Sequence, residues 1–549
     1  MTPSIADALR IDYTLIAPVF VVLGGACASV LVEALVPRRA RARVQLLLTL
    51  AVLVVALVIT VVLASGATRS PVVLGGALSV DPAALFLWAT LLALGLPSVL
   101  LLADRSVEPG GAFVADPEAL AEATAAAPAR PARGGTAAVA LPRGRRPGGG
   151  RRSSMEGGRD AASAAAAPGM HTEVFPFVLF ALGGMLVFCA ADDLLTMFVA
   201  LEVLSLPLYL LCGLGRRRRL LSQESAVKYF LLGAFASAFF LYGVALLYGY
   251  ADSVRLPDIA AAASGSLRPD TLLFAGLALL VVGLLFKASV GPFHTWTPDV
   301  YQGAPTAVTA FMASCTKVAA FGAILRVLTI AFGTTAAEWR GVMWGVVIIS
   351  MVLGAVLGLT QTDVKRMVAY SSVAHAGFLL LGAIALTPQG RSATLFYLLA
   401  YGFTTLAIFG LISLVRGPDG EAGHLSAWAG MGKRAPVLAA SMTFLLLALA
   451  GVPLTSGFTA KFAVFSAALA DGMLPLVLVA LICSAIAAFF YLRLIVLMYF
   501  SEPASDGPTV SVPGPLTTVA VTVGVVVTLL LGVVPTTALE WAVAGTFVG

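Results

Sequence analysis

The sequence is poor in charge. Only 11% of its 549 residues are charged, whereas 59% are hydrophobic, and the mean hydropathy is +0.98. A soluble domain of this size needs a far more charged surface, so the composition excludes a soluble globular protein. The alternating segments of membrane β-barrel strands are also missing. What is present is a series of apolar runs of about 20 residues, the length that crosses a bilayer as a helix. We therefore predict an all-α polytopic membrane protein.

Residues that hold cofactors are scarce as well. The four histidines have no metal-ligand spacing, no Gly-rich nucleotide loop is present, and the five cysteines are isolated in apolar segments without a CxxC pair. Iron–sulfur clusters, zinc sites and disulfide frameworks are therefore not expected. The net charge of +6 does not indicate nucleic acid, because the basic residues lie mostly in short loops. We expect no metal and no cofactor in this chain, so that any electron chemistry takes place in another chain.

Fourteen apolar spans divide the chain into five parts. Residues 1–103 contain three spans, residues 173–332 and 333–500 contain five each, and residues 501–549 contain the last. Residues 104–172 are rich in Ala, Gly, Pro and Arg, which predicts a disordered cytoplasmic linker, because this composition cannot form a core. The spans lie near residues 13–36, 44–65, 80–103, 173–190, 192–214, 222–249, 271–294, 304–332, 340–360, 363–386, 391–415, 436–470, 474–500 and 515–537.

The two five-span parts predict an inverted repeat with broken helices. A five-helix unit repeated in tandem must cross the membrane in the opposite direction the second time, an architecture typical of ion-coupled transporters. In the fourth span of each unit, FKASVGPF places Lys287 five residues before Pro292, and GVPLTSGFTAKF places Lys461 eight residues after Pro453. Lysine precedes the breaker in one unit and follows it in the other, as inversion requires. The span at 436–470 is expected to be one broken helix or two segments.

The basic residues of the loops predict the orientation. With the N-terminus placed outside, the inside loops and span ends carry 22 Lys and Arg residues, and the outside ones, among which we count Arg326, carry 7. Without the 104–172 loop the ratio is still 13 to 7. Because positively charged loops stay in the cytoplasm, both termini are predicted to face away from it.

Lysine is rare, and it is concentrated within the spans. The chain has 6 lysines against 28 arginines, and four of the six lie in apolar runs: Lys228, Lys287, Lys317 and Lys461. Each buried cation costs about 2.5–3.5 kcal/mol on the insertion scale. A buried lysine can release its proton near neutral pH, whereas arginine stays protonated in any environment. The concentration of lysine within the spans therefore predicts that these residues are proton-transfer sites.

Other groups at membrane depth extend this set. Glu202 lies near the middle of its span and Lys228 lies in the next span, so we expect a Glu202–Lys228 ion pair near a protonation switch point. His294 and His375, in GPFHTW and SSVAHAGF, can relay protons. The alternative is that the charges form static ion pairs between helices and that the histidines are ordinary core residues. It explains Glu202 with Lys228, but the other three lysines have no evident carboxylate.

Long motifs around these residues resemble the antiporter-like membrane subunits of respiratory complex I, the proton-pumping NADH:quinone oxidoreductase. The resemblance is fullest over residues 173–500 and is carried by ALEVLSLPLYLL, QESAVKYFLLGAFASAFFLYG, FKASVGPFHTWTPDVYQGAPTAVTAFMASCTKVAAFG, DVKRMVAYSSVAHAGF and SGFTAKF. Within this family the chain is most similar to the N-type subunit. It has Lys461 where the M-type typically has glutamate, and it ends after the last span without the long lateral helix of the L-type.

The resemblance implies a proton relay at the matching motif positions, which are Glu202, Lys228, Lys287, Lys317 and Lys461, and the two histidines His294 and His375 are added from their position. NADH, FMN, iron–sulfur clusters and quinone are then expected in partner subunits, and quinone acts on this chain only indirectly. The expected partners are the M-type antiporter-like subunit, small membrane subunits of the complex and the lipid bilayer. The expected location is a bacterial-type inner (plasma) membrane, crossed many times.

Two other functions fit the same residues. The relatives of these subunits include subunits of multi-component cation/proton antiporters, which use similar residues without redox coupling. The other alternative is a passive scaffold whose charges only dock neighbouring subunits. Co-purification with NADH-oxidising subunits separates an antiporter from complex I, and loss of single lysines with pumping intact would indicate a scaffold.

Cysteines introduced at Gly66 and at Gly148 are predicted to react with membrane-impermeant thiol reagents from opposite sides of the membrane. The reason is the loop-charge asymmetry, which places residue 66 outside and residue 148 inside. The measurement compares intact cells with inside-out vesicles in a background where the native cysteines are replaced by serine. Labelling of both positions from one side would contradict the fourteen-span topology.

Overall fold

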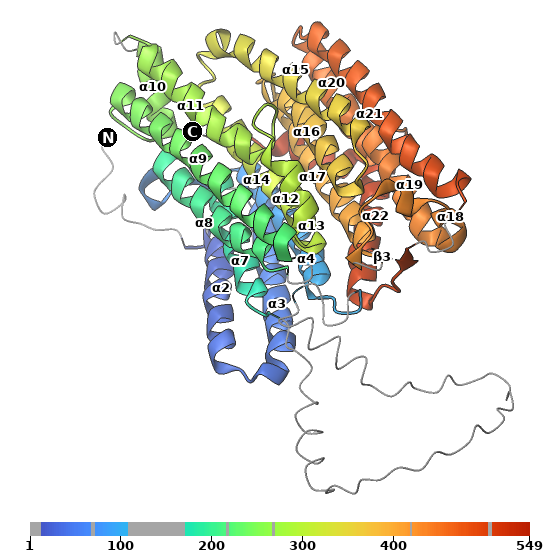
Figure 1. The fold of residues 1–549 in the computed structure, drawn as a ribbon. Coiled ribbons are helices and arrows are strands. Elements are labelled where there is room, and N and C mark those ends of the chain that lie inside the picture. The colour runs from blue at the N-terminus through green and yellow to red at the C-terminus, as the bar shows by residue number, and fades with distance from the viewer. Residues whose placement is uncertain are drawn as a thin grey trace, which may run out of the picture.

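The structure, a computed structural model, describes residues 13–66, 72–107, 113, 171–215, 219–265, 269–417, 420–502 and 508–548. The described chain is a bundle of long apolar helices with a few two- or three-residue strands in its loops (Figure 1). The predicted all-α polytopic architecture is thereby confirmed. Most of the predicted linker, residues 108–112 and 114–170, lies outside the described residues.

The chain begins with three helices that lie differently relative to the bundle. The first two form a hairpin that extends beyond the main body (Figure 1), whereas the third is mostly buried and lies in the core. A helix that is apolar on all sides suits either lipid or a protein core, and both cases occur here. The elements are α2 (Ala17–Leu35), α3 (Arg38–Ser65), β1 (Val72–Val73), η1 (Leu74–Gly76), β2 (Leu78–Ser79) and α4 (Pro82–Ala103).

Residues 173–332, which we call the first repeat, follow the linker. The Asp193 side chain starts the second helix of this part, because its Oδ1 accepts the backbone N–H of Thr196 at 2.7 Å and so caps an unpaired donor. The elements are α7 (Val174–Ala190), α8 (Leu194–Gly213), α9 (Arg219–Ala251), α10 (Leu256–Gly265), α11 (Thr271–Lys287), α12 (Trp296–Gly303), α13 (Thr306–Phe311), the π-helical turn η2 (Met312–Thr316), α14 (Lys317–Arg326) and a second π-helical turn η3 (Val327–Ala331).

Residues 333–500, the second of the two parts predicted to be related by a repeat, follow next, and we call them the second repeat. Asp363 and Thr387 cap two of its helices through the backbone N–H groups of Arg366 and Gly390. The elements are α15 (Ala336–Thr360), α16 (Val364–Ala383), α17 (Pro388–Ser413), β3 (Val415–Gly417), β4 (Gly420–Glu421), η4 (Leu425–Trp428), α18 (Met431–Arg434), α19 (Pro436–Ala450), α20 (Ser456–Ala470) and α21 (Leu474–Phe500).

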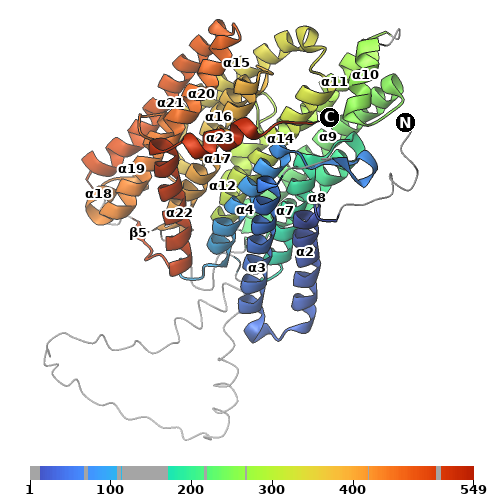
Figure 2. The same ribbon diagram turned by 180° about the vertical axis from the view of Figure 1, so that it is seen from behind.

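The C-terminal part packs back onto the earlier ones. Its strand β5 (Thr509–Val510) joins β3 and β4 in a small antiparallel sheet in the order β4-β3-β5. The last long helix, α22 (Pro515–Val533), packs against α17 and α4. The final helix, α23 (Thr536–Ala544), lies across α17 and α4 rather than along them (Figure 2).

Both expected helix breaks are present. In the first repeat the chain leaves the helix after Lys287, the last residue of α11, and becomes helical again at Trp296. In the second repeat α19 ends before Gly451, whose φ of 89° lies in the left-handed region that favours glycine, and α20 begins at Ser456. The span predicted at 436–470 is therefore two helices.

The helices agree with the predicted spans in position, while the count of fourteen crossings stays a prediction. Ten helical segments of the described chain are long and apolar enough to cross a membrane. The spans that begin near residues 173, 271 and 436 correspond to shorter apolar helices, α7, α11 and the α19–α20 pair. The remaining span is α16, which has 20 residues and contains Lys365, Arg366 and His375 among its apolar residues.

A fully buried ion pair joins the N-terminal helices to the first repeat. Arg326, at the end of α14, places Nη2 2.9 Å from Oδ1 of Asp81, the N-cap of α4, and neither side chain is exposed. Arg326 Nε donates to the Cys189 carbonyl at 2.9 Å, and the Val548 backbone N–H donates to Asp81 Oδ2 at 3.0 Å. Our count assigned Arg326 to an outside span end, and the structure places it near the end of its span but within the bundle, because the carboxylate allows the guanidinium to be buried.

Asp81→Asn is predicted to destabilise the protein by about 3–5 kcal/mol, because removing one partner of a buried pair leaves the other charge uncompensated. The measurement is the thermal unfolding midpoint of the purified membrane assembly, together with the amount of the chain in membranes. Asp258→Asn is the control, since this partly exposed carboxylate lies in the first turn of α10 and accepts from Ser253. An unfolding midpoint for Asp81→Asn equal to that of the control would contradict the assigned role.

Candidate functional site

Three of the four intramembrane lysines lie at irregularities of the helices. Lys287 is the last residue before the break that follows α11, Lys317 comes directly after the π-helical turn η2, and Lys461 lies on α20, just after the break at Gly451. Their side chains are buried, with 2–5% of the residue surface exposed. Broken helices free backbone carbonyls inside the bundle, so these are places where a buried cation can find acceptors.

Lys287 is held by neutral groups. Its Nζ donates to Ser205 Oγ on α8 at 2.7 Å and to the Tyr229 hydroxyl on α9 at 3.0 Å. The ammonium also lies 5.2 Å from the centre of the Tyr229 ring, a cation–π distance. Glu202 is three residues before Ser205 on α8 and lies within electrostatic range of Lys287. The charge of Lys287 can therefore respond to Glu202 without a fixed ion pair.

The expected Glu202–Lys228 ion pair is not formed. The Glu202 carboxylate accepts from Ser237 Oγ at 2.5 Å, whereas Lys228 Nζ lies 2.7 Å from both Asp299 Oδ2 and Glu224 Oε1. The reason is helix register. Ser237, which meets Glu202, is nine residues after Lys228 on α9, or about 13 Å along the axis at 1.5 Å per residue.

Lys317 and Lys461 are connected by one face of α16. Lys317 Nζ donates to the carbonyl of Ser372 at 2.7 Å, and Lys461 Nζ lies 5.3 Å from the centre of the Phe378 ring. These two positions on α16 are six residues apart, or about 9 Å along the axis. His375 lies midway between them and within electrostatic range of both lysines. A group that can accept and donate a proton thus separates the two ammonium groups.

His375 is fixed by two tyrosines. Its Nδ1 lies 2.8 Å from the Tyr397 hydroxyl and its Nε2 lies 3.3 Å from the Tyr491 hydroxyl. Tyr491 also hydrogen-bonds to Ser371. Both ring nitrogens are therefore engaged by hydroxyls, which can act as donor or acceptor. The histidine can pass a proton from one nitrogen to the other while its ring stays in place.

Lys461 uses the backbone groups that the second break sets free. Its Nζ donates to the carbonyls of Leu449 and Ala450, at 2.8 and 3.0 Å, and to Ser484 Oγ at 2.8 Å. Among the residues that the structure describes, no carboxylate lies within ion-pair distance of Lys461, and the same is true of Lys287 and Lys317. A static ion pair does not explain these three lysines.

Aromatic rings fill the space that leads from Lys287 towards Lys317. Tyr229, whose hydroxyl accepts from Lys287, stacks on Trp296 at 4.6 Å, and Trp296 meets Tyr301 edge-on at 6.2 Å. Tyr301 interacts electrostatically with Tyr401, whose ring centre lies 5.4 Å from Lys317 Nζ. Small movements of these rings would decide whether water can connect the two ammonium groups.

His294 has a different position from His375. It lies in the break between α11 and α12 and is buried, and its ring centre is 6.0 Å from that of Tyr370 on α16. Within the described part of the chain, it makes no hydrogen bond to any of the intramembrane lysines. The structure therefore brings His375 into the lysine row, while a role for His294 stays a prediction.

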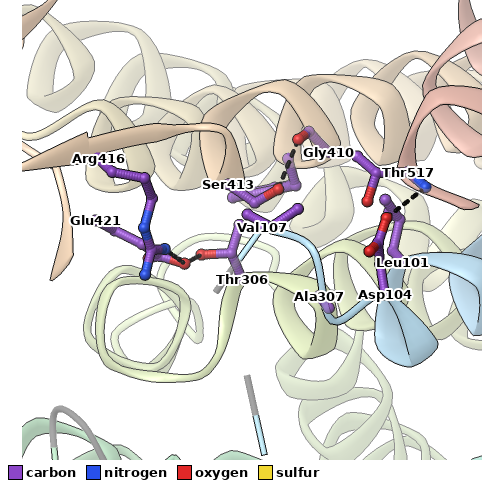
Figure 3. A pocket seen from close by; sticks show the side chains of 11 residues that line it. Leu101, Asp104, Val107, Thr306, Ala307, Gly410, Ser413, Arg416, Glu421 and Thr517 are labelled. Carbon is purple, nitrogen blue, oxygen red and sulfur yellow. Dashed lines mark hydrogen bonds and ion pairs between the residues drawn. The ribbon is translucent and has the colours of Figure 1, made fainter. Parts of the chain in front are cut away.

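A small cavity of about 30 Å³ lies at the side of the bundle predicted to face the cytoplasm (Figure 3). This volume can hold one or two waters. On one side of the cavity, Glu421 accepts from Thr306 and pairs with Arg416 at 3.7 Å, and it also pairs with Lys365. On the other side, the backbone N–H of Thr517 donates to Asp104. The cavity therefore has two carboxylates on its wall.

Neighbouring charges and hydrogen bonds favour the ionised form of both carboxylates. Burial alone would raise the pKa of Glu421, but the interactions with Lys365, Thr306 and Arg416 outweigh it and leave the pKa below its usual value. Burial of Asp104 is likewise outweighed by hydrogen bonds from Ser106 and Thr517. Thr306 is eleven residues before Lys317 on the same irregular helix, or about 16 Å along its axis.

Several residues of the site are not evident in the sequence. The hydroxyl partners Ser205, Tyr229 and Tyr397 belong to apolar helices, where Ser and Tyr are common and carry no spacing pattern. Asp299 is within the motif TPDVYQGAP, directly after the break, and a carboxylate in that place is the one signal that could have been used. Glu421 belongs to a polar loop, and only the fold brings it to Lys365.

The chain is similar to known membrane proteins along almost its whole length. Residues 191–487 match the family described as NADH:quinone oxidoreductase/Mrp antiporter, TM. A protein of Saccharopolyspora erythraea named NADH-quinone oxidoreductase subunit N is 66% identical over 98% of both chains. A protein with the same name from Rhodococcus opacus is 57% identical over 97% of this chain and 95% of its own.

Solved structures have the same fold. A chain in respiratory complex I from Thermus thermophilus, determined with bound aureothin, is 30% identical with a TM-score of 0.72, covering 96% of this chain and 100% of that one. A chain in the Mrp complex from Dietzia sp. is 22% identical with a TM-score of 0.75, covering 96% of this chain and 97% of that one. The second likeness shows the shared fold alone.

Glu421→Gln is predicted to lower stability at neutral pH by about 3–5 kcal/mol, because the buried Lys365 loses its counter-charge. The lowered pKa of Glu421 means that its contribution is complete above its unfolded pKa of about 4.3 and is lost as pH falls through the folded value. The variant should therefore show a flatter decline in unfolding midpoint between about pH 5 and pH 3. The exposed Glu502→Gln is the control, and an acid profile of Glu421→Gln as steep as that of the control would contradict this role.

Proposed function

The chain belongs to the subunit N family of NADH-quinone oxidoreductase, and from this premise we propose that it moves protons across the membrane through Lys317, His375 and Lys461, controlled by the protonation of Lys287. As a member of that family it is a membrane subunit of an oxidoreductase complex. The observation that carries the proposed relay is the row of three buried ammonium groups, each held by hydroxyls, carbonyls or rings. Such groups can gain and lose a proton without breaking a structural ion pair.

The proposed path has an entrance, a middle and an exit. The cavity beside Glu421 and Asp104 offers water and ionised carboxylates at the start of the irregular helix that leads to Lys317. From Lys317 the proton passes to His375 through the Tyr401 and Tyr397 region, and then to Lys461. The second helix break, which binds Lys461 through its free carbonyls, opens the way to the outer face.

Lys287 supplies the control of this path. The Glu202 carboxylate is close enough to stabilise a charge on Lys287 and is held by Ser237 in the arrangement described here. Quinone reduction in a partner subunit would alter this carboxylate, change the charge on Lys287, and so favour or oppose a charge on Lys317. Moving one charge against 100 mV costs about 2.3 kcal/mol, and one pKa unit corresponds to about 1.36 kcal/mol, so a change of about two units at one site is enough.

The redox chemistry belongs to partner subunits in this proposal. NADH, FMN, iron–sulfur clusters and quinone act there, and this chain responds to the conformational change that they drive. The partners that it contacts are the M-type antiporter-like subunit and small membrane subunits of the complex. We place the complex in a bacterial-type inner membrane with both termini of this chain outside the cytoplasm, as the loop charges favour.

Lys287→Arg and Lys287→Ala are both predicted to assemble and to lose most proton pumping and coupled NADH oxidation. If Lys287 must release a proton, arginine fails nearly as badly as alanine, since its pKa stays above about 12 in any environment. The measurement is NADH-driven acidification of vesicles containing each complex. Lys433→Arg and Lys433→Ala are matched controls, because Lys433 is exposed on the short helix α18.

Wild-type pumping by Lys287→Arg would refute the proton-carrier role and leave Lys287 as a fixed charge. The same preparation also separates this function from that of a cation/proton antiporter subunit. A tag on this chain should recover NADH oxidation sensitive to quinone supply. Recovery of the chain without any NADH-oxidising activity would contradict the proposed assembly.

A further inference from the structure

One carboxylate binds a cation from each repeat. Asp299, on the short helix α12, has Oδ2 2.7 Å from Lys228 Nζ and Oδ1 2.6 Å from Arg366 Nη1. Lys228 belongs to α9 of the first repeat and Arg366 to α16 of the second. Asp299 lies outside the apolar spans, and although burial raises its pKa, the hydrogen bonds from Lys228 and Arg366 outweigh burial and lower it. The carboxylate is therefore charged and shared. We call these three residues the Asp299 bridge.

The neighbours of the bridge leave it able to open. Its side chains are partly exposed, at 40% for Lys228 and 34% for Asp299, and partly exposed ion pairs are weak. Lys228 has a second partner in Glu224, and Arg366 has second partners in Gln302 and Gln361. Each cation can thus leave Asp299 without losing all of its acceptors.

Space for such a movement exists beside the bridge. A cavity of about 40 Å³ is lined by side chains of α9 and α12, with Glu224, Ser225, Asp299 and Gln302 on its wall. The volume is enough for a few waters, which can replace an ion-pair partner when the bridge opens. The Ser225 hydroxyl also donates to the Asp299 carbonyl at 3.1 Å, so that α9 holds α12 through backbone as well as side chain.

A short path connects Asp299 to Lys287. Trp296 lies one helical turn before Asp299 on α12, and its indole N–H donates to the carbonyl of Phe286 at 2.9 Å. The same indole stacks on Tyr229 at 4.6 Å and 17°, and the Tyr229 hydroxyl accepts from Lys287. A shift of α12 would therefore move two neighbours of Lys287: Phe286, the residue before it, and Tyr229, its hydrogen-bond partner.

We propose that the Asp299 carboxylate is a positioning group that couples the two repeats: by binding Lys228 and Arg366 together it fixes α12, and through Trp296 it sets the surroundings of Lys287. The inference rests on the proposed function, because it gives the second repeat a means of influencing the first relay lysine. When either cation leaves Asp299, the helix is released on that side and the net charge near Lys287 changes. Departure of either cation removes one positive charge, so Lys287 then keeps its proton more readily.

The test uses four variants in the assembled complex: Asp299→Asn, Arg366→Gln, the double variant, and Asp258→Asn as the control. Asparagine keeps the shape of Asp299 but leaves two cations uncompensated, which disfavours a third charge on Lys287. We expect pumping per NADH to fall roughly 5- to 10-fold, as for typical coupling between sites, and the alkaline limb of its pH profile to move to lower pH. Arg366→Gln removes a cation instead, so its alkaline limb should move to higher pH.

The double variant and the control make the result specific. Asp299→Asn with Arg366→Gln restores the net charge of the bridge, so its pH profile should return towards that of the wild type although α12 is held less firmly. Asp258→Asn removes a partly exposed carboxylate on α10 that accepts from Ser253, beyond the end of α9 opposite to Lys228, and it should leave the profile unchanged. A loss that is only structural would lower pumping without moving the limbs in opposite directions.

Two results would overturn the inference: wild-type pumping and pH profile for Asp299→Asn, or shifts of the same sign for Asp299→Asn and Arg366→Gln. If Asp299→Asn does not assemble, Arg366→Gln still tests the inference, because it retains the Asp299 carboxylate. Its alkaline limb must move to higher pH. Lys287→Ala in the same assay separates the two levels of the proposal. If the Asp299 prediction fails but Lys287→Ala abolishes pumping, only the role of the Asp299 bridge is rejected. If Lys287→Ala still pumps, the proposed relay is rejected as well.

Discussion

The structure depends on the burial of lysine ammonium groups among neutral partners. Inserting each cation costs about 2.5–3.5 kcal/mol, and a regular helix in lipid has no free acceptor to offset this cost. The chain provides acceptors at a helix break for Lys461, and through hydroxyls or a carbonyl of neighbouring helices for Lys287 and Lys317. Two carbonyls before the break at Gly451 accept from Lys461, and the π-helical turn η2 comes directly before Lys317. The positions of the helix irregularities and of the buried lysines Lys461 and Lys317 are therefore related.

The arrangement of the lysines also determines what can travel between them. On α16, Ser372, His375 and Phe378 succeed one another at three-residue spacing, so one helix face meets Lys317 at one end and Lys461 at the other. Between Lys287 and Lys317 the groups are mostly aromatic, and no comparable titratable side chain is seen there among the described residues. We infer that Lys287 acts on Lys317 through its charge, whereas Lys317 and Lys461 exchange protons through His375.

Much of this could be predicted from the sequence, and the limits have physical causes. The separation of lysine from arginine identified Lys287, Lys317 and Lys461, because the cost of burial removes charges that have no use from apolar runs. The Glu202–Lys228 pair was wrong, since neighbouring spans indicate contact between helices but not the register at which they pack. Arg326 was counted as a span-end charge, and its burial was not predicted, because nothing local shows that Asp81, far away in the sequence, is buried against it. The residues that bind the lysines, such as Tyr229, are ordinary members of apolar helices until the fold places them.

The most direct measurement of the central claim is the ratio of protons pumped to electrons transferred in complexes with Lys317→Ala, Lys461→Ala and both changes together. If the two lysines belong to one path, each single change removes the same protons, and the double variant has the ratio of either single one. Losses that add in the double variant, with each lysine accounting for a separate share of the protons, would contradict a continuous relay through this chain.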